Sequence, residues 1–230
     1  MTNRSLLFSA ILLSATAMAS LAKATYIPLT PTLGGNSAYT LSEITDEQAQ
    51  GKSNVFVHYE LGADNQLISH YYQYDIKPDV VSHPRVTANP NGADINGHFL
   101  NIKTVGYPGG AIFADFGDII GNITGDFIQN QADNTNESAA ISIKSGSSGD
   151  ITGDFIGNIN TSLYYSDKPG AIDAGHTGNI RGNFIGNETQ GDGGAIGIEY
   201  EKSAGNISAD IIVNNKAERL GGFLFLSASS

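Results

Sequence analysis

The sequence predicts an all-β chain folded as a parallel β-helix of about five coils, and three observations lead to this prediction. A decapeptide recurs almost unchanged as GNITGDFIQN, GDITGDFIGN and GNIRGNFIGN, at spacings of 28 and 29 residues. A second motif, GGAI with its variants, alternates with the decapeptide, and the segments between the two motifs vary in length. A fixed period interrupted by loops of variable length is typical of a solenoid, in which each repeat stacks on the previous one.

The decapeptide supplies two apolar columns. Aligned on its first isoleucine, successive copies lie 28, 28, 29 and 27 residues apart, and a phenylalanine follows four residues later in the first four copies. In the fifth copy the same count places Ile211 in the phenylalanine position. We expect each residue to lie on its equivalent in the next coil, about 4.8 Å away. The predicted core columns are Ile95, Ile123, Ile151, Ile180 and Ile207, and Phe99, Phe127, Phe155 and Phe184.

The residue types favour strands over helices. After each GGAI-type motif the apolar residues alternate, as in Ile141 and Ile143, and this period of two indicates short strands. Helical solenoids need long helix-forming runs, whereas Gly, Asn and β-branched residues at this density disfavour a helix. One coil buries too few apolar side chains to offset the entropy lost on ordering it, so the coils must stack to be stable.

An asparagine closes the repeat as Phe-x-x-Asn or its isoleucine variant. Asparagine tolerates left-handed corners, and a stacked column of its amides can form a ladder of hydrogen bonds. In the first copy Asn101 comes one residue early, which suggests an end coil. We interpret the column as a structural ladder, with a ligand site as the alternative. Its predicted members are Asn130, Asn158, Asn187 and Asn214.

The residues before the repeats follow another pattern. Alternation in residues 55–61 and a second β-like run in residues 67–76 predict a hairpin, and the proline-rich stretch 77–92 favours a linker or an irregular cap. We expect the hairpin to cover or precede the N-terminal end of the solenoid, because an open coil would expose a templating edge. The predicted division is a signal peptide at 1–24, a hairpin and cap region at 25–92, and β-helix repeats at 93–230. The last coil is incomplete, and its apolar FLFL edge favours self-association.

The first residues predict export. Arg4 precedes a short run of apolar and small residues, and Ala22-Lys23-Ala24 fits a cleavage site, so we expect cleavage after Ala24. The chain has no cysteine, which excludes disulfides and thiol catalysis. Its formal net charge of −11 disfavours nucleic acids and anionic membrane surfaces as partners.

One polar column suggests chemistry. The residues just before the phenylalanine position are His98, Asp126, Asp154, Asn183 and Asp210. Stacking places Asp126 and Asp154 about 5 Å apart, a spacing that retaining glycosidases also use but that here follows from the rise between coils. We expect these side chains to fix the corners through local backbone hydrogen bonds. A calcium site between Asp126 and Asp154 is the weaker alternative, since hard cations favour clustered oxygens.

No catalytic cluster and no cofactor site is expected elsewhere. The histidines His58, His70, His83, His98 and His176 lack the spacing of metal ligands. His58 and His70 can face each other across the predicted hairpin, and we interpret them as an ordinary exposed pair. The basic residues Lys144, Lys168, Arg181 and Lys202 are too scattered to suggest a groove. Tyr164 and Tyr165, in the longest loop, favour either stacking on a sugar or anchoring of the loop itself.

Alternation of GGAI with Phe-x-x-Asn from Ala93 to Leu226, behind a signal peptide, resembles the passenger repeats of bacterial autotransporters of the polymorphic outer-membrane protein type. The resemblance implies a right-handed parallel β-helix at, or released from, the surface of a Gram-negative bacterium, with a role in adhesion, virulence or host interaction. It covers the repeats and the export signal alone, because the membrane β-barrel that ends such proteins is not found in this sequence.

The expected function is therefore a non-enzymatic, surface-exposed or secreted solenoid that acts by adhesion to a host or bacterial surface ligand, or by self-association. A carbohydrate-active β-helix enzyme, either a polysaccharide lyase or a hydrolase, is the alternative.

Overall fold

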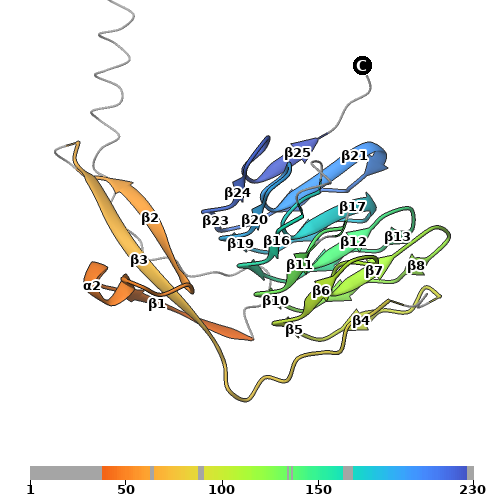
Figure 1. Ribbon diagram of the computed structural model, residues 1–230, viewed down its shortest axis with the longest axis horizontal. Coiled ribbons are helices and arrows are strands. Elements are labelled where there is room, and N and C mark those ends of the chain that lie inside the picture. Colours follow the sequence, from red (N-terminus) through yellow and green to blue (C-terminus); the bar gives the residue numbers. More distant parts are fainter. Residues whose placement is uncertain are drawn as a thin grey trace, which may run out of the picture.

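The computed structural model describes residues 38–62, 65–87, 91–133, 135, 137–162 and 168–226, apart from the side chains of 199 and 200. The chain forms a β-solenoid with four walls of parallel strands and a separate three-stranded antiparallel sheet beside it (Figure 1). Each wall is five strands deep, so the coils complete about four turns between the first strand and the last. The parallel β-helix predicted by the repeats is confirmed, together with a region that precedes it.

The strands of the solenoid are short. The first wall consists of β4 (Ile95–Asn96), β9 (Ile123–Thr124), β14 (Ile151–Thr152), β18 (Ile180–Arg181) and β22 (Ile207–Ser208). The second wall consists of β5 (Phe99–Leu100), β10 (Phe127–Ile128), β15 (Phe155–Ile156), β19 (Phe184–Ile185) and β23 (Ile212–Val213). The third wall consists of β6 (Lys103–Val105), β11 (Gln131–Asp133), β16 (Ile159–Asn160), β20 (Glu188–Thr189) and β24 (Lys216–Ala217). The fourth wall consists of β7 (Ile112–Ala114), β12 (Ile141–Ile143), β17 (Ile172–His176), β21 (Ile196–Ser203) and β25 (Leu224–Leu226), with β8 (Ile119–Ile120) and β13 (Ser147–Ser148) beside it.

The predicted apolar columns form the core of the solenoid. All five isoleucines of the first wall pair in register, from Ile95 to Ile207, and the four phenylalanines of the second wall do the same. The phenyl rings stack nearly parallel, with centroids 4.8, 5.0 and 5.1 Å apart. The isoleucines and alanines of the fourth wall close the core from the other side. Identical residues therefore recur because each one packs on its own equivalent one coil away.

The last coil departs from the predicted register. Phe184 pairs with Ile212, not with Ile211, and the phenylalanine column continues instead with Phe223, whose ring lies edge-on 5.2 Å from that of Phe184. The earlier coils turn from the first wall to the second at a glycine, which the last coil replaces with Ala209. A Cβ at Gly182 would lie less than 3.0 Å from the carbonyl oxygen of Gly153 one coil earlier. Without glycine this tight corner cannot form, so the last coil uses one more residue.

The hairpin prediction is confirmed, but a third strand joins it. Strands β2 (Val55–Leu61) and β3 (Leu67–Ile76) pair antiparallel, and β1 (Tyr39–Ile44) pairs with the other edge of β3. A short helix, α2 (Asp46–Ala49), connects β1 to β2 and begins with a capping box at Thr45. The sequence did not reveal β1, because its residues precede the alternating run and only tertiary pairing fixes them as a strand.

This three-stranded sheet lies along the side of the solenoid (Figure 1), so the hairpin precedes the repeats in the chain, as one of the two expectations held, but it does not cover their N-terminal end. Its aromatic residues Tyr39, Phe56, Tyr72 and Tyr74 pack on the outer side of the second wall, against one aliphatic residue from each coil. Those aliphatic residues are Leu100, Ile128, Ile156, Ile185 and Ile211. The apolar outer face of the second wall thus explains the position of the sheet, since this face would otherwise be exposed to water.

The irregular segment at residues 82–86 covers the N-terminal end instead. The His83 ring lies on the Phe99 ring at 4.8 Å, and the His83 amide donates to the His98 carbonyl. Val86 forms an isolated parallel bridge with Ile112. These contacts satisfy backbone groups of the first coil and extend its aromatic column, which protects the edge that the sequence pattern left open.

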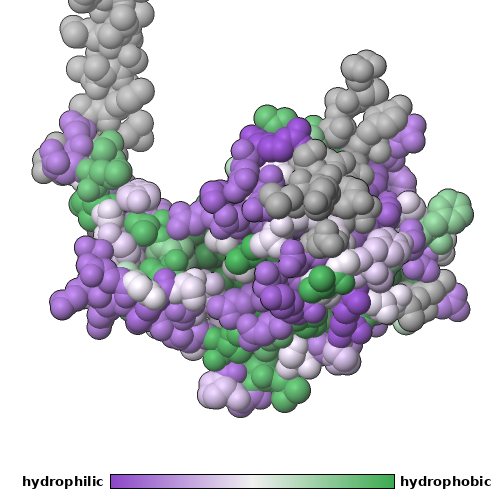
Figure 2. Space-filling view, viewed as in Figure 1, coloured by the Kyte–Doolittle hydropathy of each residue, from purple (hydrophilic) through white to green (hydrophobic). Residues whose placement is uncertain are grey.

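The surface over the solenoid is largely hydrophilic in this view, and hydrophobic side chains are visible on the three-stranded sheet and at the lower edge of the molecule (Figure 2). Among the described residues, no helix combines the length and apolar character that crossing a bilayer requires.

Candidate functional site

The asparagine ladder is present, with one corrected member. Asn130 donates from its side-chain nitrogen to the Oδ1 of Asn158 at 2.9 Å, and Asn158 donates in the same way to Asn187. Asn187 then donates to Asn215 at 2.8 Å, not to the predicted Asn214. Each amide also donates to a backbone carbonyl of the second wall in the coil before, as Asn158 does to the carbonyl of Phe127. These buried amides are thus occupied by the fold, as the structural interpretation predicted.

Asn214 belongs to a different column. It has a φ of 53° and occupies the left-handed corner between the second and third walls, where Asn101 and Gln129 both have a φ of 56°. Gly157 and Gly186 fill the same corner in the coils between them, with φ values of 60° and 61°. Counting three residues from Ile211, in the shifted last coil, had therefore selected the corner residue instead of the ladder residue. The early Asn101 of the first coil is explained in the same way.

The acidic column is also a ladder, and it runs between coils. Asp126 Oδ1 accepts the backbone N–H of Asp154 at 3.1 Å, and Asp154 Oδ1 accepts that of Asn183 at 2.8 Å. The column begins at His98, whose Nδ1 lies 3.0 Å from the Asp126 nitrogen, and ends with Asn183 accepting from Asp210. We had expected these side chains to accept hydrogen bonds within their own corner, and this expectation was wrong. The carboxylates of Asp126 and Asp154 each accept a backbone N–H of the next coil instead.

The remaining carboxylate oxygens hold the three-stranded sheet. Asp126 Oδ2 accepts the backbone N–H of Ala38 at 3.0 Å, and Asp154 Oδ2 accepts the Tyr39 hydroxyl at 2.7 Å. Both carboxylates are buried. Every oxygen of the proposed calcium pair therefore has a protein donor, and within the described ranges no three His, Asp or Glu side chains converge as metal ligands would. The geometry gives the calcium hypothesis no support.

Replacing Asp154 with asparagine is expected to flatten the dependence of stability on pH. Burial raises the pKa of Asp154 to about 6 from its ordinary value of 3.8. The folded state thus holds this proton more tightly, so the stabilisation is fully present below pH 3.8 and is lost as the pH rises through about 6. The loss amounts to about 3 kcal/mol at about 1.4 kcal/mol per pKa unit.

Urea unfolding of the wild type and Asp154→Asn across this pH window checks the prediction. Asn183 already occupies the next position of the column, so the amide fits there. Asp126 remains in both proteins, and burial raises its pKa as well. Parallel stability curves for the two proteins would contradict the assignment.

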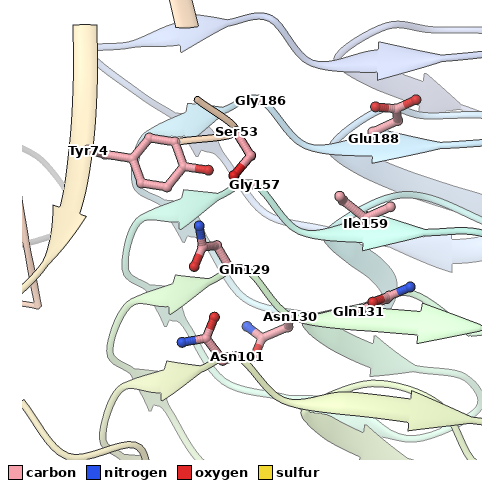
Figure 3. A pocket seen from close by; sticks show the side chains of 10 residues that line it. All are labelled: Ser53, Tyr74, Asn101, Gln129, Asn130, Gln131, Gly157, Ile159, Gly186 and Glu188. Atoms are coloured by element: carbon pink, nitrogen blue, oxygen red, sulfur yellow. The ribbon is translucent and has the colours of Figure 1, made fainter. Parts of the chain in front are cut away.

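A cleft of about 340 Å³ lies between the three-stranded sheet and the solenoid (Figure 3). We call it the sheet–solenoid cleft. On the side of the sheet it is lined by Ser53 and Tyr74, and on the side of the solenoid by the left-handed corner column and by outward residues of the third wall. The residues from the solenoid are Asn101, Gln129, Asn130, Gln131, Gly157, Ile159, Gly186 and Glu188.

The repeat positions these groups at regular intervals. Gln131, Ile159 and Glu188 are paired with one another in successive strands of the third wall, so they form a row along the solenoid axis. Tyr74 fits over the corner because that position is a glycine: a Cβ at Gly157 would lie less than 3.0 Å from the Tyr74 hydroxyl. Burial raises the pKa of Tyr74.

The chemistry of the sheet–solenoid cleft is that of amides and hydroxyls. Three side-chain amides on its surface each offer two N–H donors and one carbonyl acceptor, and Glu188 adds a carboxylate. No lysine or arginine is among its lining residues in the described part of the chain. A ligand with many neutral hydroxyl groups can satisfy such a surface. Lysines come at the two ends of the same row, where Lys103 pairs with Gln131 and Lys216 forms an ion pair with Glu188 at 2.6 Å.

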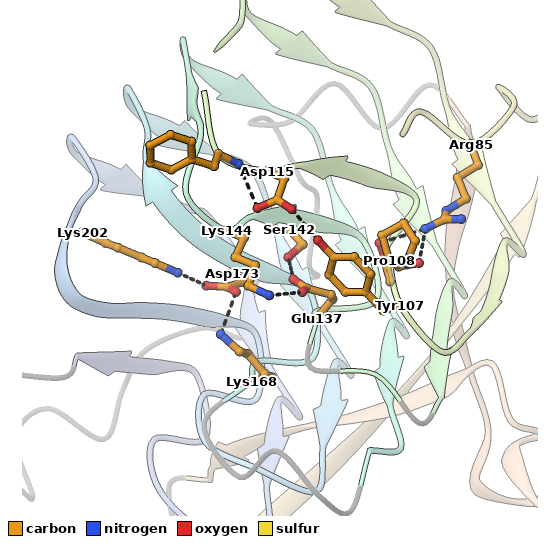
Figure 4. Close-up of polar contacts among 12 residues, drawn as sticks. Arg85, Tyr107, Pro108, Asp115, Glu137, Ser142, Lys144, Lys168, Asp173 and Lys202 are labelled. Carbon is orange, nitrogen blue, oxygen red and sulfur yellow. Dashed lines mark hydrogen bonds and ion pairs between the residues drawn. The ribbon is translucent and has the colours of Figure 1, made fainter. Parts of the chain in front are cut away.

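A charged cluster lies over the fourth wall (Figure 4). Glu137 and Asp173 are fully buried, and each is held by lysine. Lys168 and Lys202 lie 3.2 and 3.3 Å from Asp173, while Lys144 lies 3.5 Å from Glu137. The lysines that the sequence showed as scattered therefore converge on the fourth wall from different places in successive coils: Lys144 follows β12, Lys168 precedes β17 and Lys202 lies in β21.

Neighbouring groups fix this cluster further. Ser142 donates a hydrogen bond to Glu137 Oε2, and burial raises the pKa of Glu137. The Lys144 ammonium also lies 4.9 Å from the centroid of the Tyr107 ring, in a cation–π contact. Three ammonium groups thus surround two buried carboxylates, and a third carboxylate, that of Asp115, accepts the Tyr107 hydroxyl and interacts with Lys144.

The other predicted residues are accounted for as follows. His58 pairs with His70 across β2 and β3, and His70 lies between Glu43 and Glu60 at 2.9 and 3.3 Å. His176 lies 3.2 Å from the Ser203 hydroxyl. Tyr164, Tyr165 and the predicted signal peptide at 1–24 lie outside the described residues.

No protein family model, curated protein or solved structure matches this chain.

Proposed function

We propose that this chain is an exported, non-enzymatic β-solenoid that acts in adhesion by binding neutral, hydroxyl-rich saccharide in the sheet–solenoid cleft. The observation that carries the proposal is the contrast between the two kinds of polar group. The asparagine and aspartate columns are buried and occupied by hydrogen bonds of the fold, whereas the cleft presents amides and a carboxylate on the surface. Recognition therefore belongs to the cleft, while the repeated columns hold the coils together.

The regular spacing of the cleft supports a saccharide in particular. Gln131, Ile159 and Glu188 recur with the rise of the coils, about 4.8 Å. An extended saccharide also presents equivalent hydroxyl groups once per sugar unit, so successive units can meet successive coils. The ligand would lie on the surface of a host or of another bacterium, in keeping with the export signal and with the autotransporter-like repeats.

Binding of neutral oligosaccharides is expected to depend on Gln131 and Glu188. We would apply the full chain to a glycan array, and compare the wild type with Gln131→Ala and Glu188→Gln. Each lost hydrogen bond is expected to weaken binding about tenfold. Lys103→Ala is the matched control, because Lys103 is exposed on the same wall outside the cleft lining. An array signal that stays at background, or one that the cleft variants leave unchanged, would refute the proposal.

The other expectations are tested on the same samples. Self-association is the second form of adhesion that the sequence favours, and Leu220 and Leu226 are exposed in the last coil. Sedimentation velocity on the wild type reports it directly, and a purely monomeric protein would count against it. A carbohydrate-active enzyme would release reducing ends or unsaturated products from the bound saccharides, and their appearance would replace the binding function with catalysis.

A further inference from the structure

A second cleft, of about 260 Å³, opens beside the charged cluster of Figure 4. We call it the basic cleft. Four successive coils contribute to it, with Phe116 from the first, Lys144 and Ser145 from the second, His176 from the third, and Glu201 and Lys202 from the fourth. No feature of the sequence pattern indicated this cleft, because its residues come from turns of different length in each coil.

The basic cleft depends on an irregularity in β21. Ala174 pairs with Ile198 and His176 with Ser203, so two steps on β17 correspond to five on β21, and the extra residues form a bulge. Within the bulge Glu201 has a φ of 62°, a left-handed conformation that costs free energy for a residue other than glycine. Bulges and strained residues of this kind concentrate at functional sites, where they re-aim a side chain. Here the bulge brings Lys202 back over the fourth wall to Asp173.

The two lysines of the cleft are held in place before any ligand binds. Asp173 and Glu137 are buried beneath them and pair with Lys202 and Lys144. Lys144 keeps about a third of its side-chain surface exposed. The residues that line the cleft carry two ammonium groups, those of Lys144 and Lys202, and one carboxylate, that of Glu201. An anion that the rest of this acidic protein repels can therefore find a local excess of ammonium groups at the lining.

An aromatic side chain completes the cleft. Phe116 is 88% exposed, although a phenyl ring normally packs away from water. An exposed ring beside ordered ammonium groups suits a ligand that has both an apolar ring face and a negative charge. Ser145 and His176 add groups that can bind hydroxyls, and Glu201 can accept a hydrogen bond from one.

We propose that the basic cleft binds a sugar ring that carries a carboxylate. The ring lies on Phe116, its carboxylate meets Lys144 and Lys202, and its hydroxyl groups meet Ser145, His176 and Glu201. This site is separate from the sheet–solenoid cleft in residues and in ligand charge, so either one can exist without the other.

The experiment is calorimetric titration of the full chain with trigalacturonate, with the neutral trisaccharide cellotriose and with acetate. We expect trigalacturonate to bind, to bind more weakly at high ionic strength, and to be unaffected by excess acetate, while cellotriose leaves the basic cleft unoccupied. Phe116→Ala is expected to weaken binding of trigalacturonate about tenfold, since the ring packing is lost. Val81→Ala, at another exposed apolar residue, is its control.

Lys202→Gln tests the charge independently, with Lys103→Gln as its control. It is expected to reduce both the affinity and the salt dependence. Because Lys202 also pairs with Asp173, its replacement can destabilise the fold, so the melting temperature of each variant is measured beside its affinity. If Lys202→Gln is unstable, Phe116→Ala still tests the proposal, because it changes only an exposed ring. Failure of trigalacturonate to bind the wild type, equal affinity for Phe116→Ala and Val81→Ala, or equal binding of cellotriose at this cleft would overturn the proposal.

Discussion

Replacing Gly153 with alanine is expected to destabilise the solenoid by more than about 4 kcal/mol, a large part of the total stability of a typical domain. Gly153 turns the chain from the first wall to the second, directly over Gly125 of the coil before. An added Cβ would lie less than 3.0 Å from the Gly125 carbonyl oxygen. The atoms that the Cβ would meet belong to the backbone of Gly125, so no flexible side chain can move aside to make room. Gly182 stacks on Gly153 from the next coil in the same way. Relief would require the coils to separate, which breaks their pairing.

The matched control is Gly186→Ala. Gly186 lies in the corner between the second and third walls with a φ of 61°, and a Cβ there meets nothing within 4 Å. Only the left-handed conformation is unfavourable for alanine, at about 1 kcal/mol. Urea unfolding followed by circular dichroism compares the two variants. A Gly153→Ala protein as stable as Gly186→Ala would show that the coils are not in contact at this corner.

Replacing Asn158 with alanine is expected to cost about 3 to 5 kcal/mol of unfolding free energy. Its Oδ1 accepts from both the backbone nitrogen and the side-chain nitrogen of Asn130, and its own Nδ2 donates to the Phe127 carbonyl. Asn158 is fully buried, so alanine leaves these partners without water to replace the lost bonds. Each orphaned group costs about 1 to 3 kcal/mol.

Asn214→Gly is the control for the ladder. Asn214 is exposed and left-handed, a conformation that glycine adopts readily, so we expect a change within about 0.5 kcal/mol. The neighbouring Asn215, which receives the hydrogen bond of Asn187, is the sensitive one of this pair. A loss of stability at Asn214 equal to that at Asn158 would contradict the register of the last coil.

The core columns could be predicted because one residue type returns to one place in every coil. Ile95 to Ile207 and the four phenylalanines pair as the period required. The register predicted for the last coil was wrong by one residue, and the sequence contains the reason: Ala209 occupies the corner position at which the other coils have glycine. A corner that needs glycine cannot keep its length without it, and this shift moved both Ile211 and Asn214 out of their predicted columns.

The position of the three-stranded sheet could not be predicted in this way. Its contacts join Ala38 to Asp126 and Tyr39 to Asp154, across 88 and 115 residues of sequence. A repeat shows which residues stack, but it does not show which outer face stays apolar after stacking. The outer aliphatic residues, such as Ile128 and Ile156, were visible in the decapeptide, and their burial requires a partner from outside the solenoid.

The two clefts were hidden for a related reason. Gln131, Ile159 and Glu188 share a position in the coil but not a residue type, so no motif marks them. Lys144 and Lys202 come from turns of unequal length, and only the bulge in β21 brings the second of them to Asp173. Conserved-looking repeats thus report the scaffold, whereas recognition falls to the positions that vary between coils.

The most direct test of this division is an NMR titration of the amide-labelled full chain with the neutral oligosaccharide that the array selects. We predict that the perturbed backbone amides cluster along the sheet–solenoid cleft, at Gln129, Gln131, Ile159 and Glu188, while those of Asp126 and Asp154 keep their positions. Perturbations centred on Asp126 and Asp154 would contradict the account, because they would place the ligand on a column that we assign to the fold.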